Sequence, residues 1–248
     1  MKRLPSYLAI ISIVLILLTV PALAIPTPVW SDNGNALDTV LDGFSVIPDD
    51  TSVNVKEDYL ASDAYWSVDA SGGSIQSIVL SFSAPVDGKS FGIFAPDSDN
   101  DGNLEMVQLF GETSDEGDQI FLSIKADGSV WVNFADTGTD FLGDYFGYYL
   151  ISGSNIWYSN PYLNSDGQDH MVAYQGNGTD IIQIPDHVPG VWTTSSYIFG
   201  FEESSIAGDY ADFVFMAESI SPEAFIPAPG ALLLVLIGVG SLKLRKIA

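Results

Sequence analysis

The chain has 248 residues, no Cys and a formal net charge of −24. All 32 acidic residues lie between Asp32 and Glu223, where three Lys oppose them, so this region carries a net charge of −29. Nucleic acid and anionic membrane surfaces are excluded as partners because both require cationic patches. The charge indicates either a solvated, salt-tolerant surface or divalent-cation binding in particular loops.

Residues 1–24 have the composition of a secretory signal peptide. Two basic residues precede the apolar run Leu8–Val20, and Ala22 and Ala24 form a small-x-small cleavage site. The alternative is a permanent N-terminal anchor, against which Pro21 and the cleavage pattern argue. We therefore expect export and a mature chain that begins at residue 25 and has no disulfides.

Residues 25–226 are predicted to form one all-β domain. Val, Ile, Phe, Tyr, Trp and Thr dominate the apolar stretches, and Gly, Asp, Asn and Ser separate them. Short runs of this kind predict a single antiparallel β-sandwich or jelly-roll-like domain rather than βαβ units. Segment 25–35 is rich in Pro and Asn and is expected to pair weakly at an edge. The first predicted strands are Thr39–Ile47, Ser52–Lys56, Ala64–Asp69, Ser74–Ser83 and Lys89–Ala95.

A D-x-D-x-D-G motif follows these strands. Asp97, Asp99 and Asp101 alternate, Gly occupies the sixth position, and Glu105 comes shortly after. Alternate carboxylates with Gly at this position allow the chain to wrap one Ca²⁺, as in an EF-hand-type loop. The twelfth position is Gln108 rather than Glu, and a strand is predicted to follow instead of a helix. The alternative is an acidic surface turn.

The middle of the chain adds strands without recognisable chemistry. Asp118–Lys125 and Ser129–Phe134 alternate apolar and polar residues around a Gly-containing turn, which predicts a hairpin. Asp136–Asp140 is predicted to be a loop. The other predicted strands here are Leu104–Gly111, Tyr145–Ser152, Asn155–Ser159 and Asp169–Gln175.

Tyr197–Ala217 is the stretch around which the domain is predicted to be organised. Aromatic residues alternate on both arms, as in a hairpin of two half-buried strands. The connection carries Glu202, Glu203, Asp209 and Asp212, and no Lys or Arg lies between Lys125 and Lys243, so no local cation is expected. A Ca²⁺ ion would offset the repulsion among these carboxylates. Alternatively, Glu202 with Asp209 or Asp212 could form the carboxyl pair of a glycosidase.

The same stretch resembles a bacterial family known as domain of unknown function 4114. The residues that carry the resemblance are Phe201–Glu203 and Asp209–Val214, together with Phe146–Leu150 and Asn164–Met171 upstream. The resemblance spans roughly residues 140–220. It implies recurring acidic residues, for which enzymatic activity has been suggested, but no particular reaction. Ala207 and Ala211 replace an Asp and an Asn that are common in the family.

Residues 227–248 are predicted to form a sorting or anchor segment. An uncharged stretch of 13 residues, Gly230–Leu242, reaches about 20 Å as a helix, short of the roughly 30 Å hydrocarbon core. Turn prolines, a short apolar helix and a basic tip resemble the PEP-CTERM sorting signal of Gram-negative bacteria, with Ala in place of Glu. The resemblance implies processing by exosortase; the alternative is an ordinary C-terminal anchor. The signal residues are Pro227, Ala228, Pro229, Lys243, Arg245 and Lys246.

Two further residue types could carry chemistry. The only histidines, His170 and His187, are expected to be structural, because a zinc site would need more ligands of this kind. Aromatic residues could stack on sugars, although most aromatic residues of a sandwich belong to its core. The candidates for stacking are Trp157, Tyr158 and Trp192.

The sequence therefore predicts a secreted β-sandwich protein of the cell surface or extracellular matrix. We expect it to be non-enzymatic and stabilised by Ca²⁺. Two alternatives stay open. One is a carbohydrate-binding module that binds extracellular polysaccharide. The other is a carbohydrate-active enzyme that uses Glu202, Asp209 and Asp212.

Overall fold

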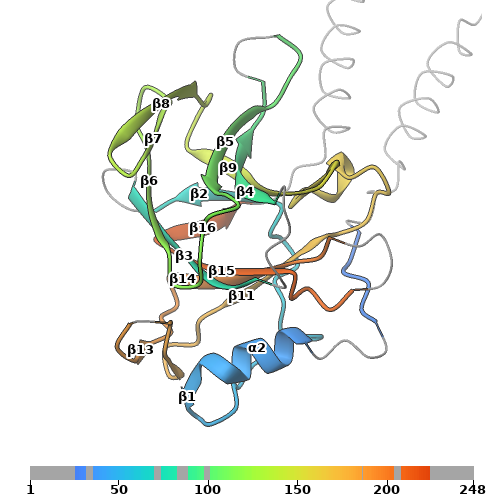
Figure 1. The fold of residues 1–248 in the computed structure, drawn as a ribbon, viewed down its shortest axis with the longest axis vertical. Helices are drawn as coiled ribbons and strands as arrows, with labels where there is room; N and C mark the ends of the chain where they lie inside the picture. Colours follow the sequence, from blue (N-terminus) through green and yellow to red (C-terminus); the bar gives the residue numbers. More distant parts are fainter. Residues whose placement is uncertain are drawn as a thin grey trace, which may run out of the picture. The chain divides into compact units, whose positions relative to one another are not determined.

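The chain folds mainly into antiparallel β-strands, which confirms the all-β prediction (Figure 1). The computed structural model describes residues 26–31, 36–69, 74–82, 89–97, 101–185, 187–203 and 208–223. The predicted signal peptide and sorting segment lie outside these ranges. No helix within them is long and apolar enough to cross a membrane. The helices are α2 (Ala36–Phe44) and the 3-10 helix η1 (Pro161–Leu163).

Three sheets contain all the strands of the described ranges. The first has six strands in the order β16-β2-β9-β4-β5, with β10 beside β9, and the second has seven in the order β11-β14-β15-β3-β6-β7-β8. A small third sheet has the order β1-β12-β13. The strands are β1 (Ser45–Ile47), β2 (Tyr65–Val68), β3 (Ser74–Phe82), β4 (Ser90–Ala95), β5 (Glu105–Phe110), β6 (Gln119–Ile124), β7 (Ser129–Val132), β8 (Ala135–Asp140), β9 (Tyr145–Ser152), β10 (Asn155–Tyr158), β11 (Met171–Gln175), β12 (Ile181–Ile182), β13 (Gly190–Val191), β14 (Ser196–Phe201), β15 (Phe213–Glu218) and β16 (Ile220–Glu223).

Aromatic side chains join the two large sheets. Phe91 of β4 and Tyr148 of β9 meet Phe215 of β15 at ring-centroid distances of 4.4 and 4.9 Å. Phe215 also stacks on Phe199 of β14 at 4.5 Å and 5°. Each buried ring contributes about 1.5–3 kcal/mol by leaving water. The hairpin β14–β15 therefore supplies the centre of the sandwich core.

The outer face of the same hairpin forms a second core with helix α2. Ile198, Val214 and Met216 alternate with the aromatic residues of β14 and β15, and they pack in one buried cluster with Leu37 and Leu41 of α2. The two strands are thus buried on both faces. The prediction of half-buried strands was wrong because the intervening residues are apolar as well.

Helix α2 replaces the first part of the predicted strand Thr39–Ile47. Leu37 and Leu41 are four residues apart and both buried, which is helical spacing, and only Ser45–Ile47 is extended. The predicted strand Ser52–Lys56 is also wrong. It forms bends and a turn, in which buried Val55 contributes to the second core.

The predicted loop at Asp136–Asp140 is instead part of strand β8. It lies at the edge of the seven-stranded sheet and pairs with β7 through a two-residue turn, with Val132 opposite Ala135. Five of the six residues of β8 are exposed. A polar strand that buries so little shows no apolar alternation, which explains why the sequence did not indicate it.

Candidate functional site

The connection between β14 and β15, which we call the hairpin mouth, comprises Glu202, Glu203 and residues 208–212 in the described part of the chain. Buried Glu202 accepts hydrogen bonds at Oε2 from the backbone N–H groups of Asp209 (2.8 Å) and Tyr210 (3.3 Å). Its carboxylate lies so close to Gly208 that a Cβ there would collide with it. Glu202 therefore caps the backbone of the mouth.

The two aspartates of the mouth also bind backbone. Asp212 Oδ2 accepts from Glu203 N at 2.8 Å, and Asp209 Oδ1 accepts from Ala211 N at 3.2 Å. Across the described ranges, no three His, Asp or Glu side chains are arranged to hold a metal ion. The structure thus explains these acids as turn-forming groups, and Ca²⁺ binding by Glu202, Asp209 and Asp212 stays a prediction.

A cation reaches the mouth from a distant part of the sequence. The ammonium group of buried Lys89 lies 3.0 Å from Glu203 Oε2. Lys89 directly precedes β4 in the opposite sheet, so sandwich packing brings the two charges together. The expectation that no local cation neutralises this cluster was therefore wrong, because it considered only neighbours in sequence.

His170 is a structural residue beside the mouth. Its Nδ1 lies 2.8 Å from Glu202 O, its Nε2 lies 3.1 Å from Asp166 Oδ2, and its ring stacks on Trp157 at 4.1 Å. Both ring nitrogens thus face an oxygen atom, which holds the ring in place. Partial burial raises the pKa of Asp166, but hydrogen bonds from Gln168 and His170 outweigh this and hold it below its usual value.

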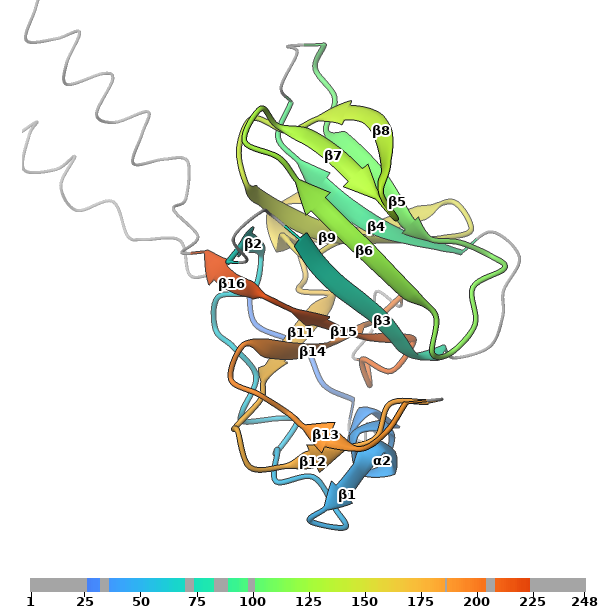
Figure 2. The same ribbon diagram turned by 90° about the vertical axis from the view of Figure 1, so that its left-hand side faces the viewer.

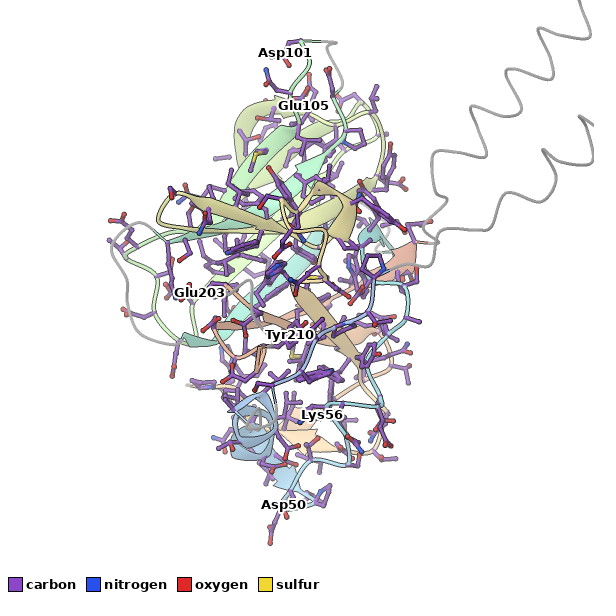
Figure 3. The ribbon with its side chains drawn as sticks, turned by 90° about the vertical axis from the view of Figure 1, so that its right-hand side faces the viewer. Asp50, Lys56, Asp101, Glu105, Glu203 and Tyr210 are labelled. Carbon is purple, nitrogen blue, oxygen red and sulfur yellow. The ribbon has the colours of Figure 1, made fainter. Side chains whose placement is uncertain are left out.

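The N-terminal segment 26–31 closes the mouth. Val29 O accepts from Gly208 N and Gly208 O accepts from Ser31 N, both at 2.9 Å. The Tyr210 hydroxyl accepts from Val29 N at 3.0 Å and donates to Asp169 O at 2.9 Å. Figure 3 shows Tyr210 in the middle of the molecule. The predicted weakly paired edge is thus tied to the centre of the fold by a residue that the sequence did not single out.

Asp169, which forms a β-bridge with Pro28 of this segment, and Asp63 are two buried carboxyl groups that interact with each other. Burial raises the pKa of Asp169 to about 7, and burial and the charge of Asp169 raise the pKa of Asp63 well above its usual value. Within the described ranges, Asp63 Oδ2 is buried without a hydrogen-bond partner. Sequence reasoning missed this pair because its members are about 100 residues apart, and no sequence pattern links Asp63 to Asp169.

The D-x-D-x-D-G loop lies far from the mouth. Figure 3 shows Asp101 and Glu105 at one end of the molecule, well separated from Glu203 and Tyr210. Asp97 accepts from Asp101 N (3.2 Å) and Gly102 N (2.8 Å), and Asp101 accepts from Asn103 N (2.8 Å). Asp99 lies outside the described residues. The two acidic clusters are thus separate, and Ca²⁺ binding by Asp97, Asp99, Asp101 and Glu105 stays a prediction.

The aromatic residues considered for sugar stacking are unsuitable. Trp157 and Trp192 are buried, and half-buried Tyr158 packs edge-on against Phe94 at 5.1 Å. The exposed pair of aromatic residues is elsewhere, at Phe121 and Phe134. The sequence did not reveal it, because Phe134 looked like the last apolar residue of a strand.

Comparisons with known proteins identify no relative. No family model matches the chain, and neither a curated protein nor a solved structure matches it. Any statement about function therefore depends on the residues of this chain.

Proposed function

We propose that the protein is an exported, non-enzymatic β-sandwich protein of the cell surface or extracellular matrix. The main support is the state of the carboxylates at the hairpin mouth. A catalytic carboxyl group must lie within reach of a substrate. Glu202 is instead buried and, like Asp209 and Asp212, accepts hydrogen bonds from the backbone of its own turn.

The terminal segments support export and sorting. Residues 1–24 have a signal-peptide pattern and residues 227–248 resemble a PEP-CTERM signal, so the proposed partner is an exosortase-type machinery that processes the tail after transient anchoring in the inner membrane. Fractionation of the producing cells tests this. We expect a mature chain that begins near Ile25 outside the inner membrane. Intact Met1 in the cytoplasm would contradict the proposal.

Ca²⁺ stabilisation is the second part of the proposal. A ligand that binds only the folded state stabilises it by about 2.7 kcal/mol at a concentration of 100 Kd. The melting temperature in about 5–10 mM Ca²⁺, roughly ten times the Kd of a weak extracellular site, should exceed that in NaCl of equal ionic strength. Asp99→Asn with Asp101→Asn should remove part of the Ca²⁺ increment, and Asp209→Asn with Asp212→Asn another part.

Ca²⁺ binding is tested only by the Ca²⁺ increment, which is the difference between the melting temperatures in Ca²⁺ and in NaCl. The absolute melting temperature is no test, because the mouth aspartates also bind backbone and their replacement lowers it. Asp136→Asn, in exposed edge strand β8, is the matched control and should keep the full increment. Equal shifts by Ca²⁺ and NaCl would identify the acids as a solvated surface.

The enzymatic alternative has a direct test. The chain is incubated with matrix polysaccharide, and the release of reducing ends is followed. We expect none. Release that Glu202→Gln abolishes would overturn the non-enzymatic proposal and assign the hairpin mouth as an active site.

A further inference from the structure

The outer face of the seven-stranded sheet is covered over one half only. Helix α2 packs on β14 and β15. On the other half, β6 and β7 bury Ile120, Leu122 and Val130 in the sandwich core and direct the alternate residues outward. Figure 2 looks onto this half, and no helix or strand of the described ranges lies in front of β6 and β7. These strands therefore present a face to solvent.

An aromatic pair dominates this face. Phe121 projects from the outer side of β6 and is 41% exposed, and Phe134 follows β7 and is 80% exposed. The two rings lie 5.7 Å apart with an angle of 26° between their planes. Single exposed apolar residues are ordinary, but a stacked pair offers a broad apolar surface of the kind that marks binding sites.

The backbone under Phe134 is strained. Asn133 and Phe134 have φ values of +49° and +66° and form the two-residue turn between β7 and β8. Both positions of such a turn need positive φ, which Asn tolerates and for which Gly is preferred to Phe. Asn133 is fixed, because its N–H donates to Phe121 O at 2.8 Å and its Oδ1 accepts from Phe121 N at 3.0 Å. A ring that is 80% exposed buries little apolar surface to offset a strained backbone, which points to a role in binding.

We propose that this face binds a neutral polysaccharide. Pyranose rings with equatorial hydroxyl groups have flat faces of C–H groups that pack on aromatic rings. The charge pattern favours an uncharged chain, because β6 and β7 contain no acidic residue in a domain of net charge −29. Asp127 and Asp136 flank the face and would repel an anionic chain.

Further groups that could contact sugar units lie next to the aromatic pair. Trp131 projects outward from β7, and the Lys125 ammonium lies 3.2 Å from the centre of its ring. A pocket of about 580 Å³ lies beside the β6–β7 turn; Lys125, Asp127 and Asp144 line it, as do Ile124, Phe141 and Val68 of the inner side of the sandwich. Phe121 and Lys125 are four residues apart, roughly 13 Å along a strand. Several consecutive sugars could therefore contact ring, ammonium and carboxylate groups in turn.

The substitution Phe134→Gly should weaken binding without destabilising the fold. It creates the Asn-Gly turn that this geometry favours, so the melting temperature should rise by a few degrees. It also removes the more exposed ring of the pair. Phe121→Ala should weaken binding without a change in the turn. Tyr162→Ala is the matched control, because Tyr162 is 42% exposed but lies in η1.

Binding is measured by native gel retardation of the full chain in a polyoxyethylene detergent, which carries no sugar. The probes are hydroxyethyl cellulose and glucomannan as neutral chains and alginate as an anionic chain. We expect retardation by at least one neutral chain and none by alginate. Phe134→Gly and Phe121→Ala should each weaken it at least tenfold, and Tyr162→Ala should leave it unchanged.

Three results would overturn the proposal. They are no retardation by either neutral chain, equal retardation by alginate, or unchanged binding in both Phe variants. If light scattering shows that Phe134→Gly dissociates a dimer while retardation is unchanged, the face is a contact between copies of the chain. The assay does not depend on export, so it can fail while the proposed function stands.

Discussion

Replacement of Asp169 by Asn should stabilise the protein at neutral pH and flatten the dependence of its stability on pH. Asp169 and Asp63 are both buried, and no cation of the described residues lowers the pKa of either. Two tyrosines of the described ranges also interact with the pair: Tyr174 with Asp63, and Tyr210 with both carboxyl groups. The two tyrosines are neutral in the relevant range, so ionisation of the pair has no compensating charge and costs free energy.

The magnitude follows from the pKa of Asp169. Burial raises it from 3.8 to about 7. A rise of this size corresponds to about 4 kcal/mol. Between these two values the folded state binds more protons than the unfolded state, so the free energy of unfolding falls as the pH rises through this window. The stabilisation is fully present below pH 3.8 and is lost above about pH 7. The raised pKa of Asp63 acts in the same direction.

The assay is urea unfolding of residues 26–225, which form one compact unit, followed by Trp fluorescence. It is carried out from about pH 4.5 to about pH 8.5, in about 0.3 M NaCl to screen repulsion between surface carboxylates. The wild type should lose a few kcal/mol over this range. Asp169→Asn should lose clearly less. At pH 8 its free energy of unfolding should exceed that of the wild type by about 1–3 kcal/mol. The gain is smaller than the full cost of ionisation because the new amide N–H groups need hydrogen-bond partners.

Asp127→Asn is the control. Asp127 is exposed, and hydrogen bonds from Ser129 hold its pKa below the usual value, so its ionisation is complete below the measured range. If Asp169→Asn and the wild type have the same slope, the buried pair does not carry a proton at neutral pH and the reasoning is wrong. If Asp127→Asn flattens the dependence of the free energy of unfolding on pH as much as Asp169→Asn does, this dependence is caused by repulsion between surface carboxylates rather than by the buried pair.

Two further predictions concern the hairpin mouth. Tyr210→Phe should destabilise the protein by about 1–3 kcal/mol, because Val29 N–H and Asp169 C=O both lose a buried hydrogen-bond partner. Hydrogen exchange at the Val29 amide should accelerate. Unchanged protection of this amide would show that the Tyr210 hydroxyl does not hold the N-terminal segment. Gly208→Ala should cost about 1–3 kcal/mol in chemical denaturation, since the new Cβ collides with the Glu202 carboxylate. Gly190→Ala is the control, because Gly190, like Gly208, has no positive φ and an added Cβ there would meet nothing within 4 Å.

The sequence determined the fold class and most strand positions. Period-2 alternation around a Gly-containing turn located β6 and β7, and the aromatic alternation of Tyr197–Phe201 and Phe213–Ala217 located the central hairpin. These features were predictable because each depends on side chains two residues apart. Helix α2 was missed because its apolar residues repeat at helical spacing over only nine residues, and β8 because it buries almost nothing.

The sequence also indicated where acids gather, but not what they contact. Motif spacing marked Asp97–Asp101 and the hairpin mouth as acidic, whereas only the tertiary structure decided that Glu202 faces backbone N–H groups and that Glu203 meets Lys89. Such contacts depend on how two sheets pack, which no local pattern encodes.

The buried pair and the aromatic face were decided by tertiary structure alone. No sequence pattern links Asp63 to Asp169, and the exposure of Phe134 follows from a left-handed turn that pairs back onto β6. Burial and exposure are properties of packed layers, so the same residue types could have been core or surface. The chain order specified the strands, but the packing of distant strands determined which side chains are available for chemistry.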